Sequence, residues 1–566
     1  MNKLLVEVLN SKRNFYFFAF FLLAIKLWLV SSHSLMATRS PHDDLLFVTQ
    51  AHNILSGNWL GGYNQFVMIK GPVYPLFIAL AYWLNIPLLS AQQLLYWLAS
   101  VTTVSAFYPI VRQKWLFYLF FLFLVFNPFS YNYPWVGRVY RLGIYPSLGL
   151  LVLSCFAGLH VRLHSSWKRI LIWLFGAGVF LAAFWNTREE SVWILPSLLF
   201  ILISMAFSLY QSKQKGRSIL RIGVFLLPLL VLLVSQYTLK IINQKKYGIN
   251  AVIELKTPEF KSAYGGLLRI KSDHWRQHYP VVKDVRKQVY AVSPAFCELK
   301  PFLEGEIGKK WQHLASSDDI PAEFFVWAFR DAVAYAGYAD NGLDALQFYK
   351  RMGTEIDQAC QAGKLDCRSR LTSLMPPWHQ EYNKLLLPTF LSIMKRLLTF
   401  RDFSASTDGM MSFGPRNIMV TYETVTREKL LTSRRDRLAA DPEYHRRLNR
   451  NKTEILNKIG AGYQNVIPFI FIPALFLFFL MAGRDLLQRK CSVPCVAAGA
   501  GLVGILSIVF IMTLLSITSY EMIERPLHSA YPMVLFFIMT VFFDLITRYN
   551  LNACVSEKGC DQEETR

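Results

Sequence analysis

Residues 14–30 read Asn-Phe-Tyr-Phe-Phe-Ala-Phe-Phe-Leu-Leu-Ala-Ile-Lys-Leu-Trp-Leu-Val, an apolar block that directly follows Lys12 and Arg13. A helix of about 20 apolar residues crosses a lipid bilayer. No small-residue cleavage site follows this block, and many similar blocks do, so it predicts a retained membrane helix rather than a signal peptide. The whole chain of 566 residues is 53% hydrophobic. Its mean hydropathy of +0.28 is unlike that of a soluble protein, whose core needs a polar cover.

The apolar blocks predict ten membrane-spanning helices with the N-terminus inside. The short loops that this arrangement places inside are rich in Lys and Arg, as the positive-inside rule requires. These basic residues are Arg112, Lys114, Arg162, Lys168, Arg169, Lys213, Lys215, Arg217, Arg221, Arg484, Arg489, Lys490 and Arg548. The predicted spans are residues 14–31, 91–111, 115–130, 142–160, 169–186, 191–210, 219–241, 464–483, 493–518 and 529–547.

Residues 72–89 are apolar but short and interrupted by prolines. Counting them as a span would invert every later loop, so we expect a helix in the outer membrane interface. Residues 385–400 are short, amphipathic and basic, which also favours an interfacial helix, with the core of a soluble domain as the alternative. The strongly basic residues 426–452 face lipid, solvent or a polyanionic acceptor; their arginines include Arg434, Arg435, Arg437, Arg446, Arg447 and Arg450.

The predicted fold class is an all-α polytopic membrane protein with an extracytoplasmic, mainly α domain. We expect an N-terminal transmembrane module at 1–242 with its first outward loop at 32–90, and the extracytoplasmic domain at 243–462. C-terminal transmembrane helices follow at 463–548, and a cytoplasmic tail at 549–566. Cys360 and Cys367 bracket a short polar loop, which suits either a local disulfide or two free thiols. We expect part of the net charge of +22 to orient the helices and part to contact anionic lipid headgroups. No nucleic-acid-binding signature is present.

Two carboxylates, Asp43 and Asp44, lie at the start of an amphipathic run in the first outward loop. The run ends at Gly57, a residue typical of helix ends. An Asp at a helix start commonly caps the helix, so capping competes with a chemical role. After a stretch rich in glycine and aromatic residues, the loop continues with Ile69-Lys-Gly-Pro-Val-Tyr-Pro-Leu76.

The order Asp-Asp, Gly-x-Trp and Lys-x-Pro-x-x-Pro before an apolar helix resembles the first periplasmic or luminal loop of GT-C glycosyltransferases, above all the aminoarabinose and protein O-mannosyl transferases. The resemblance is specific over about 35 residues, covers the layout of roughly the first 240, and does not reach 243–462. It implies a GT-C-like fold and a catalytic acidic pair, Asp43 with Asp44 as its companion. The companion is often Glu in that family and the Gly-Trp spacing is slightly longer, so the choice between the two carboxylates stays open.

The resemblance further implies a polyprenyl-phosphate sugar as donor, transfer with inversion, and an outer active site. The phosphate of this donor is the leaving group, and cations such as Lys70, Arg138, Arg141 or Arg188 would stabilise its charge. For Arg138 and Arg141 the alternative is snorkelling to lipid headgroups. Relatives often hold another acid in the second outward loop, but residues 131–141 contain none. The cofactor is therefore unknown, with a divalent metal lacking the support of a second-loop carboxylate.

Two further groups of outward residues can be explained either as parts of the site or by a structural role. Thr187 and Glu190 fit a capping box, which leaves Arg188 and Glu189 as site residues. Arg525 and His528 suit phosphate or sugar binding, or a polar cap on a helix hairpin.

The predicted function is transfer of a sugar to an extracytoplasmic glycolipid, polysaccharide or protein by a multi-pass protein of the bacterial inner membrane, with its site facing the periplasm or exterior. Its partners would be the bilayer, the lipid-linked donor and the acceptor. The alternatives are a lipid or polysaccharide transporter, or a GT-C-like assembly factor without activity. Transporters bury ionisable groups at mid-membrane, whereas here the charges gather at one face.

Overall fold

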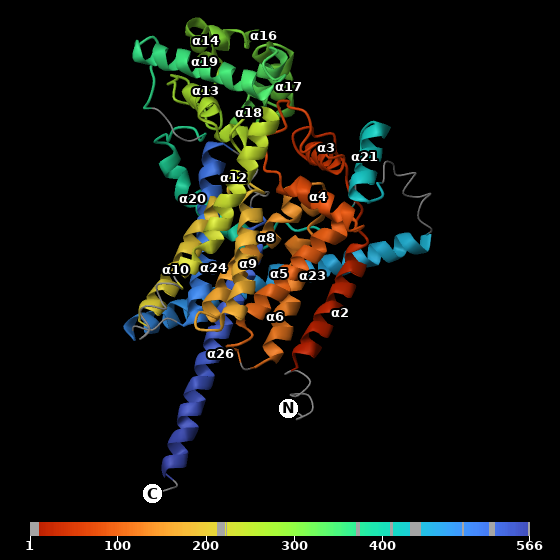
Figure 1. The fold of residues 1–566 in the computed structure, drawn as a ribbon, viewed down its shortest axis with the longest axis vertical. Helices are drawn as coiled ribbons and strands as arrows, with labels where there is room; N and C mark the ends of the chain where they lie inside the picture. Colours follow the sequence, from red (N-terminus) through yellow and green to blue (C-terminus); the bar gives the residue numbers. More distant parts are fainter. Residues whose placement is uncertain are drawn as a thin grey trace.

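The computed structural model describes residues 11–563 except 112, 212–220, 222, 370–373, 408–410, 431–442, 489–491 and 520–526. All regular elements in this part of the chain are helices, and strand-like pairing is limited to isolated bridges. A bundle of long helices carries a compact helical domain at one end, and the start of α2 and the end of α26, the first and last described helices, lie toward the other end (Figure 1). The predicted all-α fold class is confirmed.

The N-terminal module contains the helices that build the first half of the bundle and its outward loops. They are α2 (Lys12–Val30), α3 (Asp44–Leu55), α4 (Val73–Trp83), α5 (Leu88–Phe107), α6 (Trp115–Val125), η1 (Pro128–Ser130), α7 (Tyr133–Val136), η2 (Arg141–Gly143), α8 (Tyr145–Val161), α9 (Trp167–Trp185), η3 (Ser191–Ile194), α10 (Leu195–Tyr210) and α12 (Leu227–Tyr247). Helix α8 lies inside the bundle: every residue of the 18-residue apolar window in its spanning stretch is buried.

Within the described residues, seven helices are long and apolar enough to cross a membrane, and two bent helix pairs raise the number to nine. The chain is therefore a multi-pass membrane protein. Nine of the ten predicted spans correspond to these elements. The tenth, 219–241, corresponds in part to α12, whose outer half is polar and whose inner flank lies partly outside the described residues. Helix α12 still exposes an apolar stripe suited to lipid, made of Leu230, Leu233, Val234 and Tyr237.

The apolar segment at 72–89 does not form a span of its own. Helix α4 has 11 residues, about 16 Å of helix, and the chain bends by 106° between α4 and α5. Leu80, Trp83 and Leu84 are exposed on it, as expected for a helix in a membrane interface. The prediction that this segment is too short to span is confirmed. Helix α6 also ends early, at Val125, because Asn127 caps a 3₁₀ turn and the chain bends by 51° toward α7.

The outer domain has its own hydrophobic core, separate from that of the bundle. Its elements are η4 (Glu254–Lys256), α13 (Pro258–Leu268), α14 (Lys283–Val292), α15 (Pro294–Cys297), α16 (Lys300–Leu303), α17 (Glu306–Leu314), α18 (Ala322–Tyr335) and α19 (Gly342–Gln361). Cys360 and Cys367 form a disulfide that closes the C-terminal end of α19. Of the two interpretations of this pair, the structure favours the one that suits an oxidising compartment.

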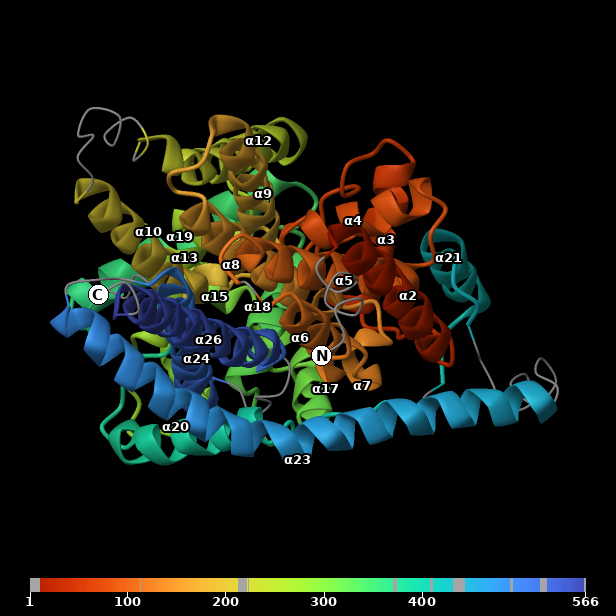
Figure 2. The same ribbon diagram turned by 90° about the horizontal axis from the view of Figure 1, so that it is seen from below.

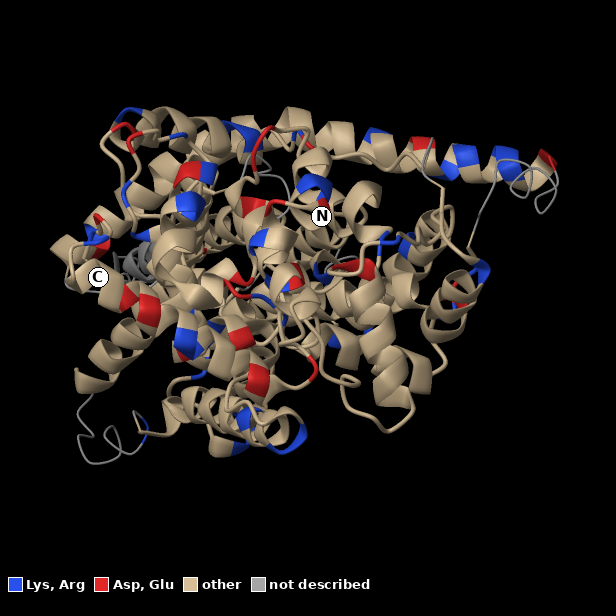
Figure 3. Cartoon of the chain, turned by 90° about the horizontal axis from the view of Figure 1, so that it is seen from above, with Lys and Arg blue, Asp and Glu red and all other residues tan. Residues whose placement is uncertain are grey.

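The segment after the outer domain returns to the bundle through α20 (Tyr382–Leu398) and α21 (Arg416–Thr426). Their buried Ile393, Leu397, Met419, Tyr422 and Val425 belong to the bundle core. The last elements are α23 (Glu443–Leu487), α24 (Val493–Thr518) and α26 (Ala530–Glu563). Helix α23 is continuous for 45 residues and passes through the predicted boundary at 462. It runs along one side of the molecule and extends beyond the bundle at its N-terminal end (Figure 2). That end carries several basic residues (Figure 3), among them Arg446, Arg447 and Arg450; Arg434, Arg435 and Arg437 lie outside the described residues.

Candidate active site

The two carboxylates of the first outward loop have different surroundings. Asp44 is fully buried, and Arg138 holds both its oxygens, with Nε to Oδ1 at 3.0 Å and Nη2 to Oδ2 at 2.5 Å. Asp43 keeps 12% of its side chain exposed and forms an ion pair with Lys70. Asp43 occupies the N-cap position of α3, but its side chain accepts no capping hydrogen bond. The capping interpretation is wrong, because these carboxylates pair with cations instead.

Close backbone packing places Lys70 in the site. The next residue is Gly71, where a Cβ atom would overlap the carbonyl oxygen of Asn186. Only glycine permits this approach, which brings the first outward loop against the loop at 186–190. The Lys70 ammonium then donates to the carbonyl of His42 at 2.5 Å as well as to Asp43. A lysine that looks isolated in the sequence therefore contacts the catalytic candidate directly.

Arg141 joins the second and third outward loops. Its Nη1 donates to the carbonyl of Thr187 at 3.0 Å and to both oxygens of Glu189, at 2.8 and 2.9 Å. Arg141 and Lys70 lie against the same Phe47 ring, at 5.8 and 5.2 Å from its centroid. Arg138 and Arg141 thus point into the protein, and the snorkelling interpretation is wrong for both. Glu189 places an acid in this cluster that the second loop itself lacks.

The capping-box prediction for residues 187–190 is also wrong. The Thr187 hydroxyl donates back to the Ala183 carbonyl at the end of α9, at 2.7 Å. Glu190 instead pairs with Arg188, whose Nε donates to Oε1 at 2.6 Å. Arg188 is buried, its guanidinium lies 5.6 Å from the Tyr145 ring centroid, and its Nη1 has no hydrogen-bond partner among the described residues. A buried guanidinium with a spare donor is suited to an anionic ligand.

Because Asp43 and Asp44 pair with different cations and differ in burial, their pKa values shift in opposite directions. Burial raises the pKa of Asp43, but the charges of Lys70 and His42 outweigh burial and hold it well below its usual range. Burial is also the largest influence on Asp44 and keeps its pKa above the usual value despite the hydrogen bonds from Arg138. Burial lowers the pKa of Lys70 to about 8, against the opposing charge of Asp43. At neutral pH, Asp43 is therefore a carboxylate and Lys70 is mainly a cation.

Glu189 is the most accessible carboxylate of the cluster, with 31% of its side chain exposed. Burial of its carboxyl acts to raise its pKa, but the charge and hydrogen bonds of Arg141 lower it below the usual value. Glu189 is accordingly ionised at neutral pH.

The outer domain supplies one wall of the site, which sequence reasoning missed. Trp327 of α18 lies 5.5 Å from the Lys70 nitrogen, and its ring centroid is 4.8 Å from that of His42. A buried pair holds this domain on the first outward loop: Arg330 donates to the Glu254 oxygens at 2.6 and 3.1 Å and to the Gln65 carbonyl at 2.8 Å. No local signal marks Trp327, because more than 250 residues separate it from Lys70.

His528 lies in the protein interior beside the second outward loop. It is fully buried, its Nε2 is 3.3 Å from the Asn132 amide nitrogen, and its Nδ1 has no partner among the described residues. Burial, with a further contribution from Arg188, lowers its pKa to about 3, so His528 is neutral. Its burial does not fit an exposed polar cap on a hairpin. The predicted site residue Arg525 lies outside the described residues.

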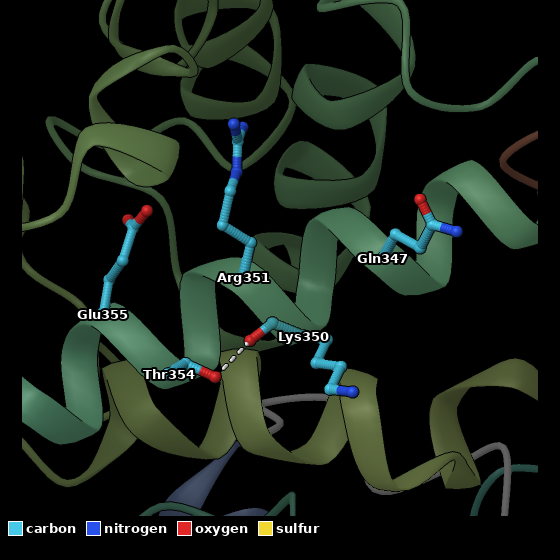
Figure 4. Close-up of a pocket in the computed structure, with 5 residues that line it drawn as sticks. All are labelled: Gln347, Lys350, Arg351, Thr354 and Glu355. Atoms are coloured by element: carbon cyan, nitrogen blue, oxygen red, sulfur yellow. Dashed lines mark hydrogen bonds between the residues drawn. The ribbon is translucent and has the colours of Figure 1, made fainter.

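No three His, Cys, Asp or Glu side chains come together as a metal site in the described part of the chain. The acids of the active site each face a cation instead. A separate hollow on the outer domain is lined by α19 residues alone, from Gln347 to Glu355 (Figure 4). None of the predicted site residues lines this hollow.

The fold and this charged outer site define a multi-pass helical membrane protein whose polar chemistry gathers below the outer domain. Two solved structures show broad similarity to it: the crystal structures of ArnT from Cupriavidus metallidurans in the apo state and bound to undecaprenyl phosphate. They are 12% and 11% identical to this chain, with TM-scores of 0.32 and 0.29, and each comparison covers 94% of this chain and 78% of the ArnT chain. No protein-family model and no curated protein sequence matches the chain.

Proposed function

We propose that this protein is a GT-C-type glycosyltransferase that moves a sugar from a polyprenyl-phosphate donor to an extracytoplasmic acceptor. The observation that carries the proposal is the contact of an ionised Asp43, which keeps 12% of its side chain exposed, with Lys70 and the nearby Arg141. Arg188, whose charge acts on Arg141, adds a further cation. In such a group the carboxylate can accept the proton of an acceptor hydroxyl, and the cations can stabilise the charge of a phosphate leaving group.

In the proposed reaction, the acceptor oxygen forms a bond to the anomeric carbon while the bond from that carbon to the phosphate oxygen breaks. The electron pair of the broken bond leaves with the polyprenyl phosphate, and the acceptor proton passes to Asp43. Direct displacement inverts the anomeric centre. Arrival of the phosphate at Lys70 would draw the ammonium away from Asp43, since one cation would then serve two anions. Donor binding would thereby release the base.

Asp44 has a different part in this proposal. Because it is fully buried and held by both donors of Arg138, it has no surface to offer a substrate. We assign it to positioning: it fixes Arg138 and the start of α3, so that Asp43 faces Lys70. The sequence leaves open which of the two carboxylates is the base; we propose that it is Asp43.

The proposed setting is the bacterial inner membrane with the site facing the periplasm. The start of α2 and the end of α26 lie toward the end of the bundle opposite the outer domain (Figure 1). At the inner end, Arg162 donates to the carbonyls of Ser105 and Ala106 at the end of α5, and Arg221 donates to Leu163. The inner loops thus carry the cations. The disulfide of the outer domain supports an oxidising compartment on the opposite side.

The test is a transfer assay with the purified full chain in vesicles, supplied with a panel of polyprenyl-phosphate sugars and cell-envelope acceptors. Released polyprenyl phosphate is the readout. Asp43→Asn is expected to be folded and inactive, whereas Asp340→Asn, at an exposed carboxylate of the outer domain, keeps activity. An active Asp43→Asn variant would remove Asp43 as the base, and no release with any donor by the wild-type protein would refute the transferase.

A further inference from the structure

A second cleft lies at the seam between the outer domain and the bundle, at the outer end of α24. We call it the seam cleft; it is lined by residues of the 268–282 segment, by Arg368, Pro376, Pro377 and Tyr382, and by Thr518. Two hydrogen bonds join the seam: Gln277 donates to the Ile517 carbonyl at 3.1 Å, and the His278 Nε2 lies 2.7 Å from the Ser516 carbonyl oxygen. Helix α20 and α3 lie on opposite flanks (Figures 1 and 2), so the cleft is distinct from the site around Asp43.

Neighbouring side chains hold the aromatic residues of the seam cleft in place. The Trp275 ring stacks on His379 with centroids 4.0 Å apart, and its centroid lies 5.7 Å from that of Tyr382. Tyr279 is fixed by a hydrogen bond of 2.7 Å to Ser317. Trp275 nevertheless keeps 39% of its surface exposed. The Trp275 ring, held in place by His379 and partly exposed, offers an apolar face on which the C–H face of a sugar ring can pack.

Among the described residues that line the seam cleft, the charged side chains are basic. Its charged or titratable lining residues include His274, Arg276 and Arg368, and none of the described residues that line it is Asp or Glu. Arg276 is already paired with Asp318, with Nη1 to Oδ1 at 2.5 Å. Arg368 forms no ion pair with any described residue. It is therefore the cation that remains for a ligand, and guanidinium groups bind phosphate and carboxylate through paired hydrogen bonds.

We propose that the seam cleft binds an anionic saccharide, with its ring on Trp275 and its phosphate or carboxylate on Arg368. The inference goes beyond the proposed transferase and does not depend on it. Two sources supply this chemistry at the outer membrane face: a remote part of a glycan acceptor, or the headgroup of a neighbouring glycolipid. A purely interfacial anchor is the competing explanation of the aromatic residues. Such an anchor would need neither a sugar nor Arg368.

The experiment titrates trehalose 6-phosphate, trehalose and inorganic phosphate into the full chain in phosphatidylcholine nanodiscs, followed by ligand-observed NMR. Trehalose 6-phosphate is expected to bind more tightly than either other probe. Arg368→Gln should weaken this binding about tenfold, as expected for the loss of a hydrogen bond to a charged group. Lys271→Gln is the matched control, because Lys271 is a nearby exposed cation outside the lining and should stay within about twofold of wild type.

Trp275→Leu should weaken trehalose 6-phosphate binding and leave phosphate binding unchanged. Equal binding of phosphate and trehalose 6-phosphate, or wild-type affinity in Arg368→Gln, would overturn the proposal. Equal losses in Arg368→Gln and Lys271→Gln would also overturn it. Asp43→Asn should bind the probe as wild type does, so failure of the transferase leaves this result intact. If trehalose 6-phosphate inhibits transfer, the cleft binds part of the glycan acceptor. If it binds without inhibiting transfer, the cleft binds the headgroup of a neighbouring glycolipid.

Discussion

The pairing of Asp44 with Arg138 predicts that loss of this carboxylate lowers stability but spares turnover in the molecules that fold. Asp44 is fully buried and Arg138 is its charge partner, so Arg138→Gln leaves a buried carboxylate without compensation. Loss of one partner of a buried pair costs about 3–5 kcal/mol. Asp44→Asn should cost a similar amount, because it leaves the guanidinium without its anion. The double variant replaces the pair by two neutral amides and should be more stable than either single variant.

The assay is unfolding of the purified protein in mixed micelles of increasing denaturing detergent, with tertiary structure followed by near-ultraviolet circular dichroism. Asp43→Asn is the comparison for activity: Asp43 is also buried, with 12% of its side chain exposed, and its loss leaves the buried Lys70 without its anion. This variant should therefore lose stability as well, but its folded molecules should show no transfer. Folded Asp44→Asn molecules should retain turnover. Single variants as stable as wild type, or a double variant whose loss equals the sum of the two, would refute the assignment of Asp44 to positioning.

Three further predictions follow from single contacts. Gly71→Ala should lower the free energy of unfolding by about 1–3 kcal/mol and reduce transfer, because its Cβ displaces the backbone that places Lys70. Gly62→Ala has open space around it and should be unchanged in the same unfolding and transfer assays. The kcat/KM for donor should fall as pH rises through about 8, the pKa to which burial lowers Lys70, and Lys70→Arg should extend the plateau to higher pH. Burial raises the pKa of Glu428 to about 7, so its ionisation opposes folding, and the free energy of unfolding should fall as pH rises from about 4.5 to 7. Glu428→Gln should match wild type near pH 4.5 and exceed its stability at pH 8 by about 2–3 kcal/mol; equal stability at both pH values would contradict this.

Sequence periodicity and charge were sufficient for the all-helical fold and most spans, because hydrophobic blocks and basic loops are local signals. The pairing within the site was not local. Asp44 meets Arg138 only because the chain near Met36 packs beside Arg138, where Met36 donates to the Gly137 carbonyl at 2.8 Å. Such a contact depends on tertiary packing, which no short motif records.

The interpretations that were wrong share a cause. Capping by Asp43, the capping box at Thr187 and snorkelling of Arg141 are each the commonest role of those residue types at a helix end near a membrane. Burial below the outer domain changes the balance, because a charged group removed from water must find a partner of opposite charge. The outer domain itself carries no recognised motif, so the approach of Trp327 to Lys70 could not be predicted from the sequence.

The most direct test of the account is whether Lys70 binds a lipid phosphate in competition with Asp43. Binding of a short-chain polyprenyl phosphate to the full chain in nanodiscs should weaken about tenfold or more in Lys70→Gln. In Asp43→Asn it should be equal or tighter, since the competing anion is removed. Unchanged affinity in Lys70→Gln, or weaker binding in Asp43→Asn than in wild type, would contradict the proposed site.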